Sequence, residues 1–260
     1  DGMSRDVVRA TERERAARER AEAANTAKTD FVARASHELR TPLSSVIGFA
    51  ELIESDKIDD PKEKIEYAKE IKASGRRLLQ IVNDMIGLST AQGSNDEVFD
   101  LRAAIDHVAK GAAEAMQSTD VTFEIDFAAD VHAFRGDERS IRRALDNLIA
   151  NAVKHAPGGR IIVAARLDGR EFTLSVSDDG EGVAPADIAS VFEPFFQSGA
   201  VLSRRHEGVG LGLAIVKAIV EAHDGLIEIA SDLGAGATIA ARFPIDRHVP
   251  RADDVHAAAA

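Results

Sequence analysis

Two apolar stripes at helical spacing, separated by a short polar break, dominate the first third of the chain. After residue 30 the apolar positions recur at intervals of three and four, with Ser36 as the polar exception. They are Val32, Leu39, Leu43, Val46, Ala50 and Ile53. Residues 55–60 are polar, and Asp60-Pro61 offers an N-cap followed by a proline at the first helical position. A second helix is therefore expected from there to about Thr90.

Two helices joined by a short loop form a hairpin, and a lone hairpin leaves one side of its apolar seam in water. Pairing with a second hairpin closes a four-helix bundle. We therefore expect a homodimer built through residues 31–92. Residues 1–30 are rich in Ala, Arg and Glu, with no Gly or Pro between 4 and 30. This composition predicts a helical, coiled-coil lead-in to the hairpin.

The pattern changes after a polar linker at residues 91–97. Short alternating segments typical of strands occur at 121–126, 161–167, 172–176, 226–230 and 237–243. Helical segments are expected at about 101–117, 137–155, 185–191 and 211–223. Hairpins mixed with helices predict an α+β sandwich over residues 97–246. Residues 247–260 are expected to form a disordered tail.

Charge and composition exclude several classes of function. The formal net charge is −12, which argues against nucleic acid as a main ligand, because phosphate contacts need a surplus of Lys and Arg. The chain has no cysteine, so disulfides and thiolate metal sites are excluded. No apolar run approaches the roughly 20 residues that cross a bilayer. We expect no membrane contact in this fragment and a cytoplasmic location, with a longer protein at the inner membrane left open, since both ends resemble fragment boundaries.

The predicted helix at 137–155 carries polar residues on one arc and apolar residues on another. Ile141, Leu145, Leu148 and Ala152 share the apolar face. The polar arc holds Asn147, Asn151, Lys154 and His155. Two interpretations stay open at this point. The arc is either a solvated face, or a site where an amide oxygen binds Mg²⁺ and the lysine binds phosphate.

Two glycine-rich segments suggest close approach of a ligand to the backbone. Asp178-Asp-Gly-Glu-Gly182 follows a predicted strand, and its glycines allow a tight turn. A carboxylate at the end of the strand could accept a hydrogen bond from an amino group such as that of adenine. Gly208-Val-Gly-Leu-Gly-Leu213 opens a predicted helix, and free N–H groups at a helix N-terminus suit a phosphate chain. The second segment is neither the dinucleotide fingerprint nor a Walker motif. Residues 197–207 between the two segments are expected to form a mobile lid.

Taken together and in this order, these motifs resemble those of two-component sensor histidine kinases. SHELRTPL (36–43) resembles the H box, and DNLIANAVKHAP (146–157) resembles the N box. SDDGEGV (177–183) and GVGLGL (208–213) resemble the two glycine boxes, and FEPFF (192–196) resembles the F box. The resemblance covers about residues 30–245. It implies a histidine phosphotransfer domain followed by a Bergerat-type ATPase sandwich that uses ATP and Mg²⁺.

The resemblance also implies roles for individual residues. His37 corresponds to the phosphoacceptor, Glu38 to its acidic neighbour, and Thr41 to a position that helps hold a water during dephosphorylation of the partner. Asn151 corresponds to the Mg²⁺ ligand, and Asp178 to the residue that reads adenine. The remaining nucleotide contacts implied are Asn147, Lys154, His155, Gly180, Gly182, Gly208, Val209, Gly210, Leu211 and Gly212. The phosphoryl group would pass from His37 to an aspartate of a response-regulator receiver domain.

The chain departs from the common family pattern at a few positions. Val209 stands where Thr or Ser is frequent, and Gln197 follows the F box where a basic residue is frequent, so Arg204 or Arg205 in the lid would have to supply a positive charge. Two other functions are compatible with parts of the pattern: a non-catalytic ATP-binding scaffold that controls a partner, and an ATPase of the chaperone or mismatch-repair type. His107, His132, His223 and His248 are expected to be surface or structural residues.

The H box also raises a question of geometry. On a helix, His37 points away from the apolar seam and shares its side with Thr41, Ser44 and Gly48. Pro42 has no N–H to give to the carbonyl of residue 38. We therefore expect a bend in the helix near the histidine.

Overall fold

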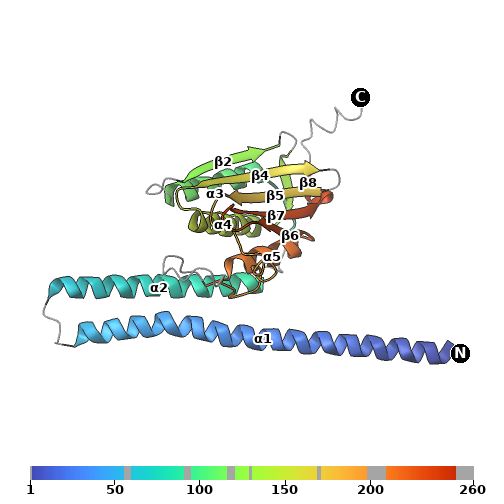
Figure 1. Ribbon diagram of the computed structural model, residues 1–260, viewed down its shortest axis with the longest axis horizontal. Helices are drawn as coiled ribbons and strands as arrows, with labels where there is room; N and C mark the ends of the chain where they lie inside the picture. The colour runs from blue at the N-terminus through green and yellow to red at the C-terminus, as the bar shows by residue number, and fades with distance from the viewer. Residues whose placement is uncertain are drawn as a thin grey trace. The chain divides into compact units, whose positions relative to one another are not determined.

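A computed structural model describes residues 2–55, 60–90, 95–115, 121–128, 131–168, 171–197 and 209–249. The chain divides into two compact units, Asp1–Val82 and Asn83–Ala260. Figure 1 labels the helices and strands of both units.

The first unit is the predicted helical hairpin. Helix α1 spans Gly2–Glu54, and α2 spans Pro61–Thr90, of which the turns from Asn83 onward belong to the second unit. The expected N-cap is confirmed, because the Asp60 carboxylate accepts a hydrogen bond of 2.8 Å from the Lys62 N–H. The rings of Phe49 and Tyr67 stack with centroids 5.4 Å apart.

Part of the apolar surface of the hairpin stays in water in the single chain. Ala35, Pro42 and Ile81 are buried. Several large apolar residues are exposed instead, among them Val32, Leu43, Ile47, Ile65, Leu79 and Val82. Helix α1 continues through Pro42 without interruption, and the bend there remains a prediction. Within the described residues, no helix is both long enough and apolar enough to cross a bilayer.

The second unit is built on a five-stranded sheet of order β2-β4-β5-β7-β6. The strands are β2 Thr122–Phe127, β4 Arg160–Asp168, β5 Glu171–Asp178, β6 Leu226–Ser231 and β7 Ala237–Pro244. Both predicted hairpins are confirmed, since β4 pairs antiparallel with β5 and β6 with β7. Strand β2 lies parallel to β4 at one edge.

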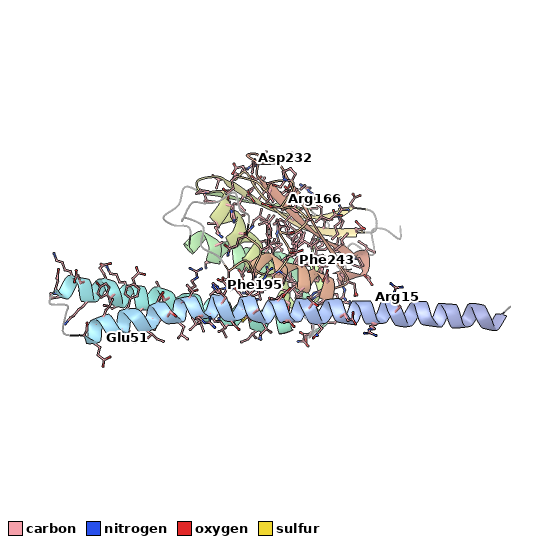
Figure 2. The ribbon with its side chains drawn as sticks, turned by 60° about the horizontal axis from the view of Figure 1, so that its bottom comes forward. Arg15, Glu51, Arg166, Phe195, Asp232 and Phe243 are labelled. Atoms are coloured by element: carbon pink, nitrogen blue, oxygen red, sulfur yellow. The ribbon has the colours of Figure 1, made fainter. Side chains whose placement is uncertain are left out.

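Helices cover one face of this sheet, which makes the unit a two-layer α+β sandwich (Figure 1). They are α3 Leu101–Ala115, α4 Glu138–His155 and α5 Gly212–Ala222. Alternate residues of the central strands are buried on the helical side: Phe172, Leu174, Val176, Ile239, Ala241 and Phe243. The other face carries ion pairs, such as Arg166–Asp126 and Arg242–Glu228. Figure 2 labels Arg166 of this face and Phe243 of the buried face.

A second, small sheet was not predicted. It has the order β1-β3-β8, with β1 Glu97–Asp100, β3 Ala133–Gly136 and β8 His248–Val249. Strand β8 follows the short 3-10 helix η1, Ile245–Arg247, and pairs antiparallel with β3. Arg247, His248 and Val249 therefore differ from the disordered tail expected for 247–260. Strands of two to four residues are too short to show an alternation of apolar and polar residues. Their pairing partners are also far away in the sequence, so no hairpin pattern marks them.

The helix expected at 185–191 was wrong. The segment forms consecutive turns, in which Asp187 N–H bonds to Ala184, Ser190 N–H to Asp187, and Glu193 N–H to Ser190. Each bond spans three residues rather than the four of an α-helix. Pro185 and Pro194 enclose the segment, so an α-helix here would be shorter than a stable one requires.

Candidate active site

In the first unit, the candidate site is the exposed side of α1 at His37. The His37 side chain is 76% exposed, and its Nδ1 lies 3.9 Å from Oε1 of Glu38. This separation is longer than a hydrogen bond, so Glu38 is a charged neighbour of the ring rather than its bonded partner in this conformation. The Thr41 hydroxyl donates to the His37 carbonyl at 3.3 Å. The three H-box residues named from the sequence therefore lie within one turn of each other.

In the second unit, α4 presents its apolar face to the core and its polar arc away from it. The side chain of Asp137, the N-cap, accepts from the N–H of Arg139, and the Ser140 hydroxyl donates to it at 2.6 Å. The predicted apolar face is confirmed, since Ile141, Leu145, Leu148 and Ala152 are all buried. The four polar residues, Asn147, Asn151, Lys154 and His155, are half-buried.

Asn147 connects α4 to the second glycine segment. Its amide nitrogen donates to the Arg143 carbonyl at 2.9 Å, which turns its Oδ1 outward. A Cβ added to Gly212, the first residue of α5, would lie 3.1 Å from that oxygen. The structure therefore brings together two motifs that are 65 residues apart in the sequence.

Asn151 and Lys154 lie one turn and two turns further along α4. The Asn151 amide has no hydrogen bond to another residue in the described part of the chain, although it is half-buried. Burial lowers the pKa of the Lys154 amino group, and the Glu181 carboxylate opposes this change. A half-buried amide that makes no hydrogen bond to the described residues, beside a lysine, is suited to bind a ligand that carries oxygen atoms and negative charge.

Asp178 ends β5 and is the first residue of the first glycine segment. Burial raises the pKa of the Asp178 carboxyl, and the neighbouring Asp179 adds to this increase. Hydrogen bonds from the N–H groups of Gly180 and Ala237, together with nearby His155, act in the opposite direction and lower the pKa. The Gly180 N–H donates to Oδ1 of Asp178 at 3.0 Å. One carboxylate oxygen is thus held by the backbone, which orients the group.

The two glycines of this segment are required by close contacts. A Cβ on Gly180 would lie 2.2 Å from the carbonyl oxygen of His155. Gly182 has φ +67, and a Cβ there would lie 2.1 Å from the carbonyl oxygen of Asp232. The segment is therefore pressed between the end of α4 and the β6–β7 hairpin.

His155 has a partner that the sequence did not reveal. Its Nδ1 lies 2.6 Å from Oε1 of Glu181, and its carbonyl accepts from the Glu181 N–H at 3.2 Å. The end of α4 is thus bound to the first glycine segment through both the backbone and a side chain. No local pattern predicts the pair, because its members lie 26 residues apart.

The second glycine segment rests on the F box. The Phe195 N–H donates to the Gly210 carbonyl at 2.8 Å, and both residues have positive φ, +64 and +73. Val209 and Leu211 are buried. Leu211 is the N-cap of α5, and its side chain makes no hydrogen bond to the first N–H groups of the helix, which an α-helix leaves without partners of their own. Arg204, Arg205 and Gly208 lie outside the described residues.

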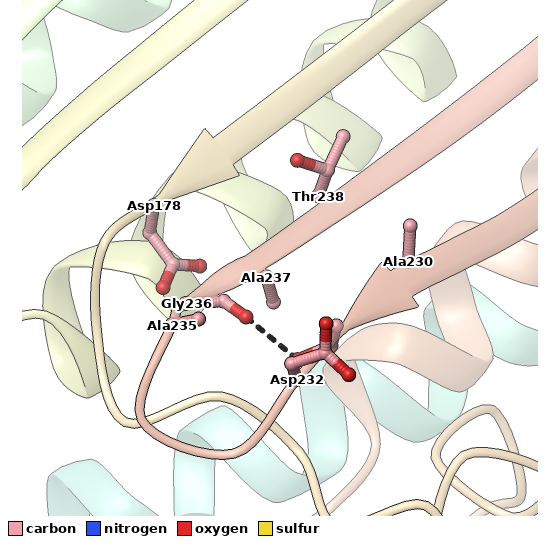
Figure 3. Close-up of a pocket in the computed structure, with 8 residues that line it drawn as sticks. Asp178, Ala230, Asp232, Ala235, Gly236, Ala237 and Thr238 are labelled. Atoms are coloured by element: carbon pink, nitrogen blue, oxygen red, sulfur yellow. Dashed lines mark hydrogen bonds between the residues drawn. The ribbon is translucent and has the colours of Figure 1, made fainter.

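A hollow of about 220 Å³ adjoins Asp178 on the side of the β6–β7 hairpin (Figure 3). Its walls include Asp232, Gly236 and Thr238, and the Ser231 hydroxyl donates to the Gly236 carbonyl at 2.7 Å. Gly236 has φ +84, and a Cβ there would lie 2.0 Å from the Asp178 carbonyl oxygen. The sequence interpretation missed Gly236, although the Gly-Ala-Gly at 234–236 was a usable signal for a tight hairpin turn.

The residues present fit a metal-bound nucleoside triphosphate. Uncapped N–H groups at the start of α5 suit phosphate oxygens. Amide oxygens suit Mg²⁺, and an oriented carboxylate suits the amino group of a base. Among the described residues, no cluster of three or more His, Cys, Asp or Glu is placed to hold a metal ion by itself. A metal bound here would therefore rely on Asn151 and on the phosphates.

Comparison with known proteins assigns each unit to a domain family. Residues 27–94 match the His Kinase A (phospho-acceptor) domain. Residues 136–247 match the family of histidine kinase-, DNA gyrase B- and HSP90-like ATPases.

Two similar proteins are named as histidine kinases. The chain is 36% identical over 239 residues to an uncharacterised sensor-like histidine kinase of Rhizobium meliloti, covering 87% of this chain and 44% of that protein. It is 34% identical over 249 residues to the cell-division control histidine kinase PdhS of Brucella suis, covering 89% of this chain and 24% of that protein. The chain thus spans less than half the length of these relatives.

A solved structure shows the same fold. The histidine kinase ThkA, in complex with the response regulator protein TrrA, superposes with a TM-score of 0.68 at 23% identity, over 83% of this chain and 61% of that one. With both domain families matched in order along the chain, the protein belongs to the sensor histidine kinases, a family of enzymes with a HisKA phosphoacceptor domain followed by an ATPase domain.

Proposed function

We propose that this chain binds MgATP, phosphorylates His37 and passes the phosphoryl group to a response regulator. The observation that carries the proposal is the contact between Asn147 and Gly212, which joins the N box to the second glycine box. Together with the uncapped start of α5 and the oriented Asp178, it forms a nucleotide site in a chain that also displays an exposed histidine.

The nucleophile would be Nε2 of His37. Glu38 lies on the Nδ1 side of the ring, so a proton on Nδ1 leaves a lone pair on Nε2. Attack forms a bond from Nε2 to the γ-phosphorus and breaks the bond from that phosphorus to the bridging oxygen, which leaves with ADP. The ring becomes positively charged, and Glu38 stabilises this charge and can take the Nδ1 proton.

The ATPase domain contributes positioning and charge. Asp178 would accept a hydrogen bond from the adenine amino group, and the N–H groups that begin α5 would bind the phosphates. Asn151 would hold Mg²⁺, assisted by Asn147 and Lys154. A bound Mg²⁺ supplies neutralisation of the charge that develops on the phosphate oxygens. Arg204, Arg205, Gly208, Gly210 and Gly212 are further nucleotide contacts in this proposal.

Two partners belong to the proposal. The exposed apolar residues of the hairpin, such as Leu43, Ile47 and Leu79, would be covered by a second copy of residues 31–92 in a four-helix bundle. A receiver domain would dock beside His37; the complex of ThkA with TrrA is a precedent from a protein of the same fold. The finer proposal of phosphatase activity rests on Thr41, whose hydroxyl lies one turn from His37.

Labelling with γ-³²P-ATP tests the central step. An acid-labile, base-stable label should appear on the wild type and be absent from His37→Gln. Label at the wild-type level in that variant would overturn the assignment. A chain that binds nucleotide but never gains label would instead favour the scaffold alternative, and steady ATP hydrolysis without label would favour a chaperone-type ATPase.

A further inference from the structure

His223 is a buried histidine that the proposed chemistry does not use. It is the C-cap of α5 and is 2% exposed. Its Nδ1 lies 2.8 Å from the Ile219 carbonyl, and its Nε2 lies 3.0 Å from the backbone nitrogen of Asp137. A carbonyl can only accept and a backbone N–H can only donate, so the ring carries its proton on Nδ1 and accepts at Nε2. Both bonds together require the neutral ring.

The hydrogen bond to Asp137 completes the N-terminal cap of α4. In a capping box, the side chain three residues after the N-cap accepts the N-cap's own N–H. That position is Ser140 here, and its hydroxyl instead donates to the Asp137 carboxylate. His223 accepts the Asp137 N–H from 86 residues away. Gly136 makes room for the ring, because a Cβ there would lie 2.6 Å from His223 Cδ2.

The bond also fixes the register between the two helices of the nucleotide site. Two of the contacts between α4 and α5 are His223 on Asp137 at one end, and Gly212 beside Asn147 at the other. These contacts are roughly 15 Å apart along α4 and about 16 Å apart along α5, at 1.5 Å of rise per residue. The two distances are nearly equal, so both contacts form in the same register of the two helices. A slide of one helix along the other would disturb both of them.

We propose that His223 is a positioning residue, which holds Asn147 and Asn151 in register with the second glycine box only while its ring is neutral. The inference rests on the proposed nucleotide binding and extends it. Protonation of Nε2 would remove the acceptor and place a positive charge against the Asp137 N–H. Acid strong enough to protonate the ring should therefore weaken nucleotide binding.

Charged side chains belong to the residues that flank His223 or its contacts, and their effect must be separated from that of the ring. They are Asp137 on α4, Arg135 on β3, and Asp224 after α5, whose carboxylate is bonded to Arg247. Carboxylates and guanidinium groups ordinarily keep their charge between about pH 8 and about pH 5.5. His155 on α4 is the same in all the variants that are compared, so any effect of its own is common to them.

Two substitutions of matched polarity separate the two hydrogen bonds. His223→Gln places an amide oxygen near Nε2 and keeps an acceptor for the Asp137 N–H that cannot be protonated. His223→Asn places its amide near Nδ1, so it retains the Ile219 bond and loses the Asp137 bond. The readout is the affinity of the full 260-residue chain for a fluorescent, non-hydrolysable ATP analogue with Mg²⁺, from about pH 8 to about pH 5.5.

At pH 8, His223→Gln should bind like the wild type, and His223→Asn should bind roughly 3- to 10-fold more weakly, the usual size of a lost cap. Towards pH 5.5, the wild type should lose more affinity than His223→Gln does. Parallel pH profiles, or a His223→Asn variant with lower melting temperature and unchanged affinity, would overturn the proposal. If the wild type binds no nucleotide at any pH, the proposed function fails instead.

A measurement on the wild type covers the case in which a variant does not fold. The Asp137 amide proton, followed by NMR, should shift upfield over the same pH interval in which nucleotide affinity falls, because it loses its acceptor. An Asp137 amide that stays constant while affinity falls would assign the pH dependence to another group and overturn the role of His223.

Discussion

The carbonyl oxygen of His155 lies 2.2 Å from the point where a side chain at Gly180 would begin. Both partners in this contact belong to the backbone, so neither can rotate away. The last turn of α4 and the first glycine segment therefore approach each other closely because position 180 has no Cβ. Asp178 gains from the same arrangement, since the Gly180 N–H holds its carboxylate.

Gly180→Ala should weaken ATP binding at least about tenfold, because the segment must move away from α4 and carry Asp178 with it. The measurement is equilibrium binding of an ATP analogue. Gly111→Ala is the matched control: Gly111 is an exposed residue of α3 with open space around it, so alanine should raise stability by up to about 1 kcal/mol and leave binding unchanged. Unchanged binding in Gly180→Ala would mean that the segment adapts.

Asn151→Ala should lower affinity for MgATP by roughly tenfold or more and leave the fold intact, because the amide is half-buried and has no hydrogen bond within the described residues. Calorimetry in Mg²⁺ and again in EDTA tests the reason. In EDTA the wild type and the variant should bind ATP equally weakly. A difference that persists in EDTA would assign Asn151 to the nucleotide rather than to the metal.

Asp178→Asn should bind ATP roughly 5- to 10-fold more weakly, because a charged acceptor is replaced by a neutral one. The same change should raise the melting temperature at pH 7 by roughly 1–3 °C. Burial raises the folded-state pKa of Asp178 above its ordinary 3.8, so the ionised form costs stability at neutral pH.

The sign of this pH dependence is specific. The stability gained from protonated Asp178 is complete below pH 3.8 and is lost as the pH rises through the folded-state pKa. The advantage of Asp178→Asn should therefore shrink as the pH is lowered from 7 towards 4, as followed by thermal unfolding. An advantage that stays constant with pH would show that the carboxylate charge is not its cause.

Leu43→Glu combined with Leu79→Glu should abolish the proposed dimer. These side chains are 47% and 62% exposed in the single chain, so charge there should leave the hairpin folded but prevent a second copy from covering it. Light scattering should give about 27.8 kDa, half the mass of the wild type. Glu70→Lys, nine residues before Leu79 and so on the opposite side of α2, should remain dimeric. A wild type of 27.8 kDa would contradict the dimer.

Local patterns predicted the helical elements and the hairpins because the forces that form them act over a few residues. The three- and four-residue spacing of apolar side chains defined α1, α2 and the buried face of α4. The alternating runs around 168 and 231–237 defined two hairpins. The helix predicted at 185–191 was wrong. The segment begins at Pro185 and is followed by Pro194, which leaves too few residues for a stable α-helix.

The sequence by itself determined the class of this protein, since its motifs retain their order and residue types without any knowledge of the fold. The tertiary structure alone decided how those motifs are held. Examples are His223 capping α4 from 86 residues away, Glu181 bonded to His155, and Phe195 supporting Gly210. Such contacts arise only when distant segments pack, because a hydrogen bond depends on the distance and direction between two groups, and the spacing of residues along the chain does not encode either one.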